Sequence, residues 1–228
     1  MPKTILAIGA HYDDCPYGIP GTLLQAVRQH HKVVILNLIG DYTNWPPVRG
    51  REQALIDLSI KLAAERGMEM RFLRYGSMAF EPSLGLKREI AKVVAEVRPD
   101  TAFLLWHKDR HPDHEAASAA AFAALQQPAR LSGDDNARSP SQVYWFDNGP
   151  GHTIDFTPDT FVDVTDEWAA AAEWLGQLMA FVRNAPFDPL KDSAVESKSI
   201  LARYRGLACG ARYAEATRSV RPRPTELF

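Results

Sequence analysis

Strand-length apolar runs alternate with helix-like segments through the first half of the chain. The run at 4–10 is continuously apolar and the run at 32–39 is rich in β-branched residues, as expected for buried strands of a parallel sheet. Between them, apolar side chains recur at helical spacing, as Leu55, Leu58 and Leu62 do. The runs occupy residues 4–10, 32–39, 70–75 and 101–106, and the helical segments occupy 22–31, 51–66 and 86–97. The alternation predicts an α/β fold with a Rossmann-like, mainly parallel sheet flanked by helices.

The chain length of 228 residues suits one large domain, which we expect to consist of two parts. Residues 1–130 are predicted to form the Rossmann-like core. A stretch rich in Pro, Gly, Ser, Asp and Asn follows at 128–141 and predicts a mobile surface loop. Residues 142–228 are predicted to form a smaller C-terminal α+β extension that completes the same domain and its pocket. Its expected elements are strands 143–146 and 161–164, helices 166–182 and 193–204, and an extended arm at 218–228.

Composition and charge limit the classes of partner. The formal net charge of −2 provides no basic field for nucleic acid or an anionic membrane surface. No apolar stretch approaches the roughly 20 residues that a spanning helix needs. The two cysteines, Cys15 and Cys209, are too few for a disulfide framework. We therefore expect a cytoplasmic protein that acts on a small molecule.

Two histidine–aspartate clusters stand directly after or shortly after predicted strands. The sequence HYDD occupies residues 11–14, and HPDH occupies residues 111–114. Ligands of open α/β sheets bind outside the carboxyl ends of the strands, so we expect the two clusters to meet there. In the second cluster, Pro112 suits the first position of a helix, which places His111 at the cap and His114 one turn into the helix.

The combined residues match the needs of a hydrolytic metal site. Two histidines and one carboxylate leave coordination positions open for water and substrate, as a catalytic zinc site requires. A further carboxylate can act as general base, and a further histidine can stabilise an oxyanion or protonate a leaving amine. Spacing alone leaves the aspartates undecided, because a tight turn aligns His11 with Asp14 and an extended segment aligns it with Asp13.

The paired motifs resemble those of the PIG-L/LmbE-like zinc-dependent N-deacetylase family. The usual AHPDDE motif stands here as AHYDDC at residues 10–15, and HPDH opens a helix after a later strand. The resemblance extends in order through Arg49 and Glu52, Asp109, and the segment 213–215 near the end. It implies removal of an acetyl (acyl) group from an N-acetylated amino sugar, mostly a glucosamine derivative, or from a related small amide. It is also compatible with a homo-oligomer.

The resemblance also implies roles for individual residues. His11, Asp14 and His114 would hold Zn²⁺, with Fe²⁺ or Co²⁺ as alternatives. Asp13 would be the general base for the metal-activated water. His111 would be the acid or oxyanion stabiliser, oriented by Asp113.

Two positions depart from the family motif, since Tyr12 replaces its proline and Cys15 its glutamate. We expect Cys15 to be a small semi-buried thiol rather than a metal ligand.

Four residues are candidates for contact with substrate. Asp41 and Asn44 follow the second strand and either contact sugar hydroxyls or form a turn. Arg49 either holds a substrate carboxylate or pairs with Glu52. His152 lies in a glycine-rich loop that can reach the pocket.

Two other functions remain as alternatives. An HxD motif with a distant histidine is also the ligand set of non-haem iron oxygenases, although these sites usually occur in all-β jelly rolls. The altered first motif also allows a non-catalytic, carbohydrate-binding relative.

Overall fold

Seven strands form one mixed sheet in the computed structural model, which describes residues 1–189 and 191–221. The strand order is β3-β2-β1-β4-β5-β7-β6. The first five strands of this order are parallel, and β7 is antiparallel to both β5 and β6. The strands are β1 (Thr4–Gly9), β2 (Lys32–Asp41), β3 (Glu69–Gly76), β4 (Thr101–Leu105), β5 (Gln142–Phe146), β6 (Thr160–Asp163) and β7 (Ala214–Ser219). The predicted α/β fold with a mainly parallel sheet is confirmed.

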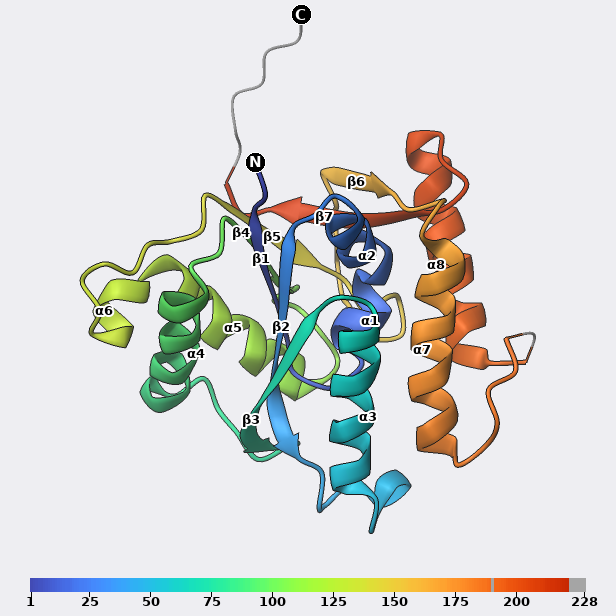
Figure 1. Ribbon diagram of the computed structural model, residues 1–228, viewed down its shortest axis with the longest axis horizontal. Helices are drawn as coiled ribbons and strands as arrows, with labels where there is room; N and C mark the ends of the chain where they lie inside the picture. The colour runs from blue at the N-terminus through green and yellow to red at the C-terminus, as the bar shows by residue number, and fades with distance from the viewer. Residues whose placement is uncertain (190, 222–228) are drawn as a thin grey trace, which may run out of the picture.

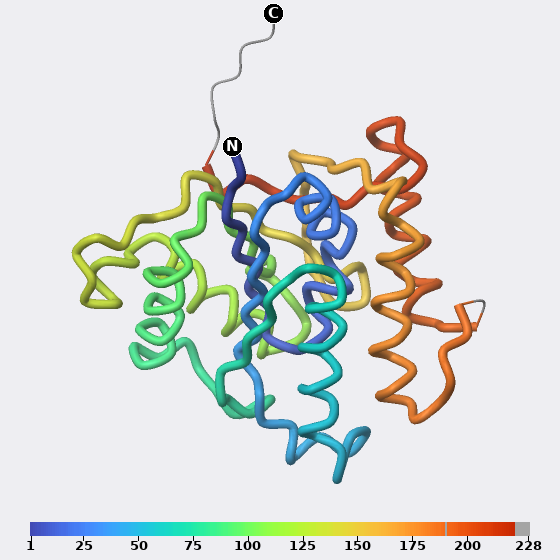
Figure 2. Tube along the Cα trace, viewed as in Figure 1, coloured from blue at the N-terminus to red at the C-terminus, as the bar shows by residue number. Residues whose placement is uncertain are grey.

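Helices cover both faces of the sheet (Figure 1). One face carries α4 (Leu84–Val97), α5 (Pro112–Gln126) and α6 (Pro128–Ser132). The other carries α1 (Asp14–Gly18), α2 (Pro20–Arg28), α3 (Glu52–Glu65) and α7 (Trp168–Arg183). The helix α8 (Ser193–Cys209) runs beside α7 and also packs on β7 (Figure 2). Because both faces are covered, the central strands β1 and β4 are buried over most of their length, as their apolar runs predict.

The C-terminal part continues the sheet of the N-terminal part. Its strands β5, β7 and β6 extend the sheet beyond β4. A buried ion pair of the C-terminal part contacts the N-terminal part: Lys198 on α8 lies 3.4 Å from Glu215 on β7 and donates a hydrogen bond to the Gly18 carbonyl. Glu215 also accepts hydrogen bonds from the backbone N–H groups of Gly21 and Thr22, at the start of α2. These contacts fix α8 against the first two helices.

Three elements differ from the sequence-based prediction. A short helix, α1, begins inside the first cluster, where only a loop was expected. The expected mobile loop at 128–141 contains α6, which has Pro128 at its first turn and Gly133 in the left-handed conformation at its C-cap. Part of the expected arm at 218–228 belongs to β7, and residues 222–228 of that arm lie outside the described residues. The strand β7 lacks an apolar run because it buries Glu215 and Thr217.

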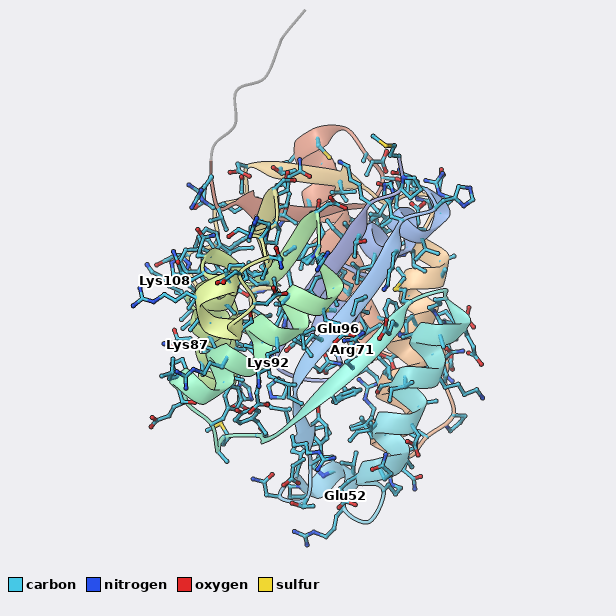
Figure 3. The ribbon with its side chains drawn as sticks, turned by 60° about the vertical axis from the view of Figure 1, so that its left-hand side comes forward. Glu52, Arg71, Lys87, Lys92, Glu96 and Lys108 are labelled. Atoms are coloured by element: carbon cyan, nitrogen blue, oxygen red, sulfur yellow. The ribbon has the colours of Figure 1, made fainter. Side chains whose placement is uncertain are left out.

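Charged side chains gather on the surface around α4 (Figure 3). Arg71 of β3 pairs there with Glu96 at 2.9 Å, and Lys87 and Lys92 project from α4. Within the described part of the chain, no helix combines the length and apolar character that spanning a bilayer requires.

Candidate metal centre

The two histidine–aspartate clusters meet at the carboxyl ends of β1 and β4. These strands are parallel neighbours, so the loops that follow them leave the sheet side by side. His11 lies in the loop after β1, and Asp14 begins α1. His111 caps α5 by accepting a hydrogen bond from the Asp113 backbone N–H, and His114 lies in the first turn of that helix. The predicted convergence of the clusters is therefore present in the structure.

Three donor groups converge at this point. His11 Nδ1 lies 3.2 Å from His114 Nε2 and 3.6 Å from Asp14 Oδ2, and His114 Nε2 lies 3.1 Å from Asp14 Oδ1. A tetrahedral zinc ion with ligands at about 2.0–2.2 Å separates neighbouring ligand atoms by about 3.3–3.6 Å. The donor types and their spacing therefore fit a divalent metal ion, and His11, Asp14 and His114 form a candidate metal-binding group.

Each of the two histidines places its second ring nitrogen beside a carboxylate. His11 Nε2 lies 3.1 Å from Asp113 Oδ2, and His114 Nδ1 lies 3.1 Å from Asp109 Oδ1. A carboxylate in this position orients a metal-binding imidazole and raises its basicity. The arrangement leaves Nδ1 of His11 and Nε2 of His114 to face the centre.

Asp14 is held on both of its oxygens. Oδ2 accepts hydrogen bonds of 2.7 Å from the backbone N–H groups of Ala10 and His11. Oδ1 accepts a 2.8 Å hydrogen bond from the side-chain amide of Asn148, which follows β5. A Cβ at Gly9 would lie 2.9 Å from the Cβ of Asp14, so the carboxylate folds back over the strand end only because residue 9 is glycine.

The electrostatics of the cluster favour a positive charge between these groups. Burial lowers the pKa of His11, but hydrogen bonds to Asp113 and Asp14 outweigh it and raise that pKa to about 9. Burial also opposes the charge of His114, yet Asp14 and Asp109 raise its pKa to about 10. In turn, His114 and His11 hold the pKa of Asp14 well below its usual range against the effect of burial. A site that stabilises imidazolium so strongly suits a bound cation.

Asp13 and His111 line the same cavity beside these donors. Burial and the charge of Asp14 raise the pKa of Asp13, which makes its carboxylate a stronger base. His111 Nδ1 accepts the Asp113 N–H, so the neutral ring carries its proton on Nε2. Burial and the neighbouring charges of His11 and His114 lower the pKa of His111.

The carboxylate of Asp113 lies closer to His11 than to His111. Its Oδ2 is 3.1 Å from His11 Nε2 but 3.8 Å from His111 Nδ1. Ser77 Oγ donates a 2.7 Å hydrogen bond to the same oxygen, and the Met78 N–H donates to both oxygens. Asp113 thus orients His11 with its carboxylate and His111 with its backbone N–H.

A cavity of about 800 Å³ opens above the cluster. Of the four candidate substrate residues, only His152 lines it. Asp41 accepts hydrogen bonds from Thr43 in a turn, and Asn44 donates to the Ser77 carbonyl. Arg49 is exposed outside the cavity. Glu52 lies on the surface at the start of α3 (Figure 3) and accepts a hydrogen bond from the Gly50 N–H.

Sequence reasoning missed two residues that hold the cluster together. Ser77 lies just after β3 and Asn148 just after β5, so both occupy the same edge of the sheet as the clusters. Their position after a strand is a usable signal, since ligands of open α/β sheets bind at this edge. Neither belongs to a charged or histidine-rich motif.

The structure explains both departures from the family motif. The Tyr12 N–H donates a 3.0 Å hydrogen bond to Tyr42 Oη, which a proline at this position cannot do because it lacks the N–H group. The two rings pack edge to face at 5.7 Å. Cys15 is fully buried, and burial raises the pKa of its thiol. It packs in the core and belongs to none of the candidate metal-binding groups of the described residues.

A known family model matches the segment of the chain that contains both clusters. The sequence model of the PIG-L family, described as GlcNAc-PI de-N-acetylase, matches residues 6–125. This segment covers more than half of the chain and includes both clusters.

Solved structures share the whole fold at low sequence identity. GalB, a 4-carboxy-2-hydroxymuconate hydratase from Pseudomonas putida, aligns with a TM-score of 0.84 and 21% identity over 99% of both chains. The N,N'-diacetylchitobiose deacetylase from Pyrococcus horikoshii aligns with a TM-score of 0.77 and 20% identity over 96% of this chain and 84% of that one. The teicoplanin deacetylase Orf2, solved in a zinc-inhibited form, aligns with a TM-score of 0.67 and 16% identity over 97% of this chain and 100% of that one.

Proposed function

Because the chain belongs to the PIG-L (GlcNAc-PI de-N-acetylase) family, we propose that it is a metal-dependent hydrolase that removes an acetyl (acyl) group from the nitrogen of a small amide. The observation that carries the proposal is the convergence of three donors, His11, Asp14 and His114, each of which also contacts a further polar group that orients it. The α/β fold gives no support to the alternative of a non-haem iron oxygenase, whose sites usually occur in jelly rolls.

In this proposal, His11, Asp14 and His114 hold the metal. The ion is Zn²⁺, with Fe²⁺ or Co²⁺ as alternatives that the same donors accept. When bound, such an ion polarises a carbonyl oxygen and lowers the pKa of a coordinated water to about 7.

In this proposal Asp13 moves the proton and His111 stabilises the oxyanion. Asp13 removes a proton from the attacking water, which adds to the acyl carbon. Asp13 then passes this proton to the amide nitrogen as the C–N bond breaks, while the neutral His111 ring donates a hydrogen bond from Nε2–H to the oxyanion, so that acetate and a free amine leave. In this proposal Asp113 positions both His11 and His111 and takes no part in the proton transfers.

The substrate that we propose is an N-acetylated amino sugar or a related small amide. The family description supports the sugar, and the cavity volume of about 800 Å³ lies within the range of small-molecule sites. Trp45 lines the cavity and offers a ring on which a sugar can stack. We also propose a cytoplasmic location, because both cysteines are free, as is usual in a reducing compartment.

A screen for released amine tests the function. Metal-loaded protein is incubated with N-acetyl sugars and simple N-acyl amides, and fluorescamine detects new primary amines, while elemental analysis counts the bound metal. We expect amine release from at least one N-acetyl sugar and about one metal ion per chain. A protein that holds no metal and cleaves no amide contradicts the proposal.

Asp13→Asn is the diagnostic variant. It removes the base but none of the three donors, so turnover should fall to background while bound metal stays near one ion per chain. Loss of metal in this variant would show that Asp13, rather than Asp14, is the ligand.

A further inference from the structure

Among the described residues, no lysine or arginine lines the cavity, and its basic side chains are histidines. On helix α8, Lys198 and Arg205 lie between the cavity-lining positions, and each is paired with a carboxylate: Lys198 with Glu215, and Arg205 with Asp147 at 3.0 Å. Other cations, such as Lys87 and Lys92, project from α4, which covers the opposite face of the sheet from α7 (Figure 3). A phosphate or carboxylate on a substrate would therefore enter the cavity without a lysine or arginine to pair with it.

One wall of the cavity changes from polar to apolar along α8. Ser193 and Ser197 line the cavity at the start of the helix, and Ile200, Leu201 and Tyr204 line it further on. At about 1.5 Å per residue, this lining face extends for roughly 16 Å. The side chains of Ile200 and Tyr204 are each 64% exposed, so part of this apolar wall has no cover from the chain itself.

We propose that the cavity takes an uncharged N-acyl substrate whose amine half carries an apolar or aromatic group that lies against Ile200, Leu201 and Tyr204. The inference rests on the proposed function for one point, that the amide lies at the metal centre. An acetyl group is too small to fill about 800 Å³, so the amine half of the substrate extends into the rest of the cavity, of which the α8 wall forms one side. Substrates with a phosphate or carboxylate there are disfavoured, because burying an unpaired anion is costly.

The lack of lysine and arginine among the described residues that line the cavity also bears on the comparison with GalB, one of the solved structures that share the fold. GalB acts, by its name, on a carboxylated muconate. Several carboxylates need several cations, and no lysine or arginine of the described residues lines this cavity. The shared fold therefore does not imply a shared substrate class.

Binding to metal-stripped protein tests the inference without turnover. The probes for calorimetry are 4-nitrophenyl N-acetyl-β-glucosaminide, methyl N-acetyl-β-glucosaminide and N-acetylglucosamine 1-phosphate. We expect the nitrophenyl glycoside to bind about tenfold more tightly than the methyl glycoside, since contact with an aromatic ring contributes up to this factor. The phosphate should bind more weakly than either neutral glycoside.

Two variants of α8 form a matched pair. Tyr204→Ala should remove most of the preference for the nitrophenyl glycoside and leave the affinity for the methyl glycoside unchanged. Leu207→Ala removes a large apolar side chain that is 83% exposed on the same helix but does not line the cavity, so it should leave both affinities unchanged.

Four results would overturn the inference: equal or tighter binding of the phosphate, no preference for the nitrophenyl group, no detectable binding of any probe, or equal effects of the two variants. A change in oligomeric state in both variants, without a change in preference, would assign the apolar wall to contact with a second copy instead. If the preference holds but metal-loaded protein releases no amine from any probe, the proposed hydrolysis fails while the apolar ligand site stands.

Discussion

The floor of the cavity and its α8 wall are built in opposite ways. On the floor, the three donors of the metal centre each contact further polar groups, and hydrogen bonds or close carboxylates fix their orientation. On the wall, Ile200, Leu201 and Tyr204 present apolar surface, and two of them are largely exposed. Side chains that are held in one orientation, as on the floor, suit a single chemical step. An apolar, partly exposed wall instead determines which molecules bind.

The two regions also differ in how the chain supplies them. Floor residues come from the loops and first helical turns that follow several strands, so their positions depend on the register of the sheet. Wall residues come from one helix, which the buried pair of Lys198 and Glu215 holds in place. We therefore expect substitutions on the floor to change metal binding, and substitutions on the wall to change ligand choice alone.

His114→Ala should have the largest effect. It removes one of three protein donors, the imidazole that lies 3.1 Å from Asp14, so bound metal should fall from about one ion per chain to near zero. Elemental analysis after gel filtration measures this, together with loss of amine release. His107→Ala is the control, because His107 is an exposed histidine near the same loop that belongs to none of the candidate metal-binding groups. Retention of metal by His114→Ala would remove His114 from the proposed centre.

Asp109→Asn and Asp113→Asn should each weaken metal binding by about 10- to 100-fold, the usual effect of losing a carboxylate behind a histidine ligand. Competition with a chromophoric chelator measures the affinity. Asp41→Asn is the control, since Asp41 forms an exposed turn outside the cavity. If Asp113→Asn lowers turnover but leaves metal affinity unchanged, Asp113 serves His111 alone, as the family resemblance implies.

The sequence predicted the parts of the molecule whose signal is local. Strands β1 and β4 are continuous apolar runs because both of their faces are covered, and the clusters that follow them are short contiguous motifs. Strand β7 was not predicted, because it has no apolar pattern. It buries Glu215, which accepts hydrogen bonds from backbone N–H groups at the start of α2. That partnership spans almost the whole chain, and no local pattern reveals it.

The same reasoning applies to the candidate site. The residues of each motif are contiguous, so the sequence identifies them together as site residues. Asn148 contributes a single amide after a strand and was not identified from the sequence. Asp41 and Asn44 are candidates because they follow a strand, and Arg49 is one because it matches a family motif with Glu52, but local hydrogen bonds or exposure keep all three outside the cavity. Position after a strand brings a residue to the correct edge of the sheet, and tertiary packing decides whether its side chain lines the cavity.

Asn148→Ala should have a smaller effect on metal affinity than the two aspartate variants, with a loss of about tenfold at the lower end of the usual range. Asn148 provides only one of the three hydrogen bonds to Asp14, and the backbone N–H groups of Ala10 and His11 remain. The same chelator competition measures the change, and Asn136→Ala in an exposed loop is the control. A loss above 100-fold would mean that the amide, rather than the backbone, sets the orientation of Asp14.

Tyr42→Phe should leave the metal centre intact and reduce only stability. The change removes the oxygen that accepts the Tyr12 N–H, and a buried N–H group without a partner costs about 1–3 kcal/mol. Chemical denaturation should therefore show a lower free energy of unfolding, while metal content and the preference for the nitrophenyl glycoside stay unchanged. Tyr204→Phe, on the exposed α8 wall, should leave stability nearly unchanged. Loss of metal in Tyr42→Phe would instead show that the Tyr12–Tyr42 hydrogen bond shapes the first motif, so that the aromatic side of the cavity and its polar floor act as one unit.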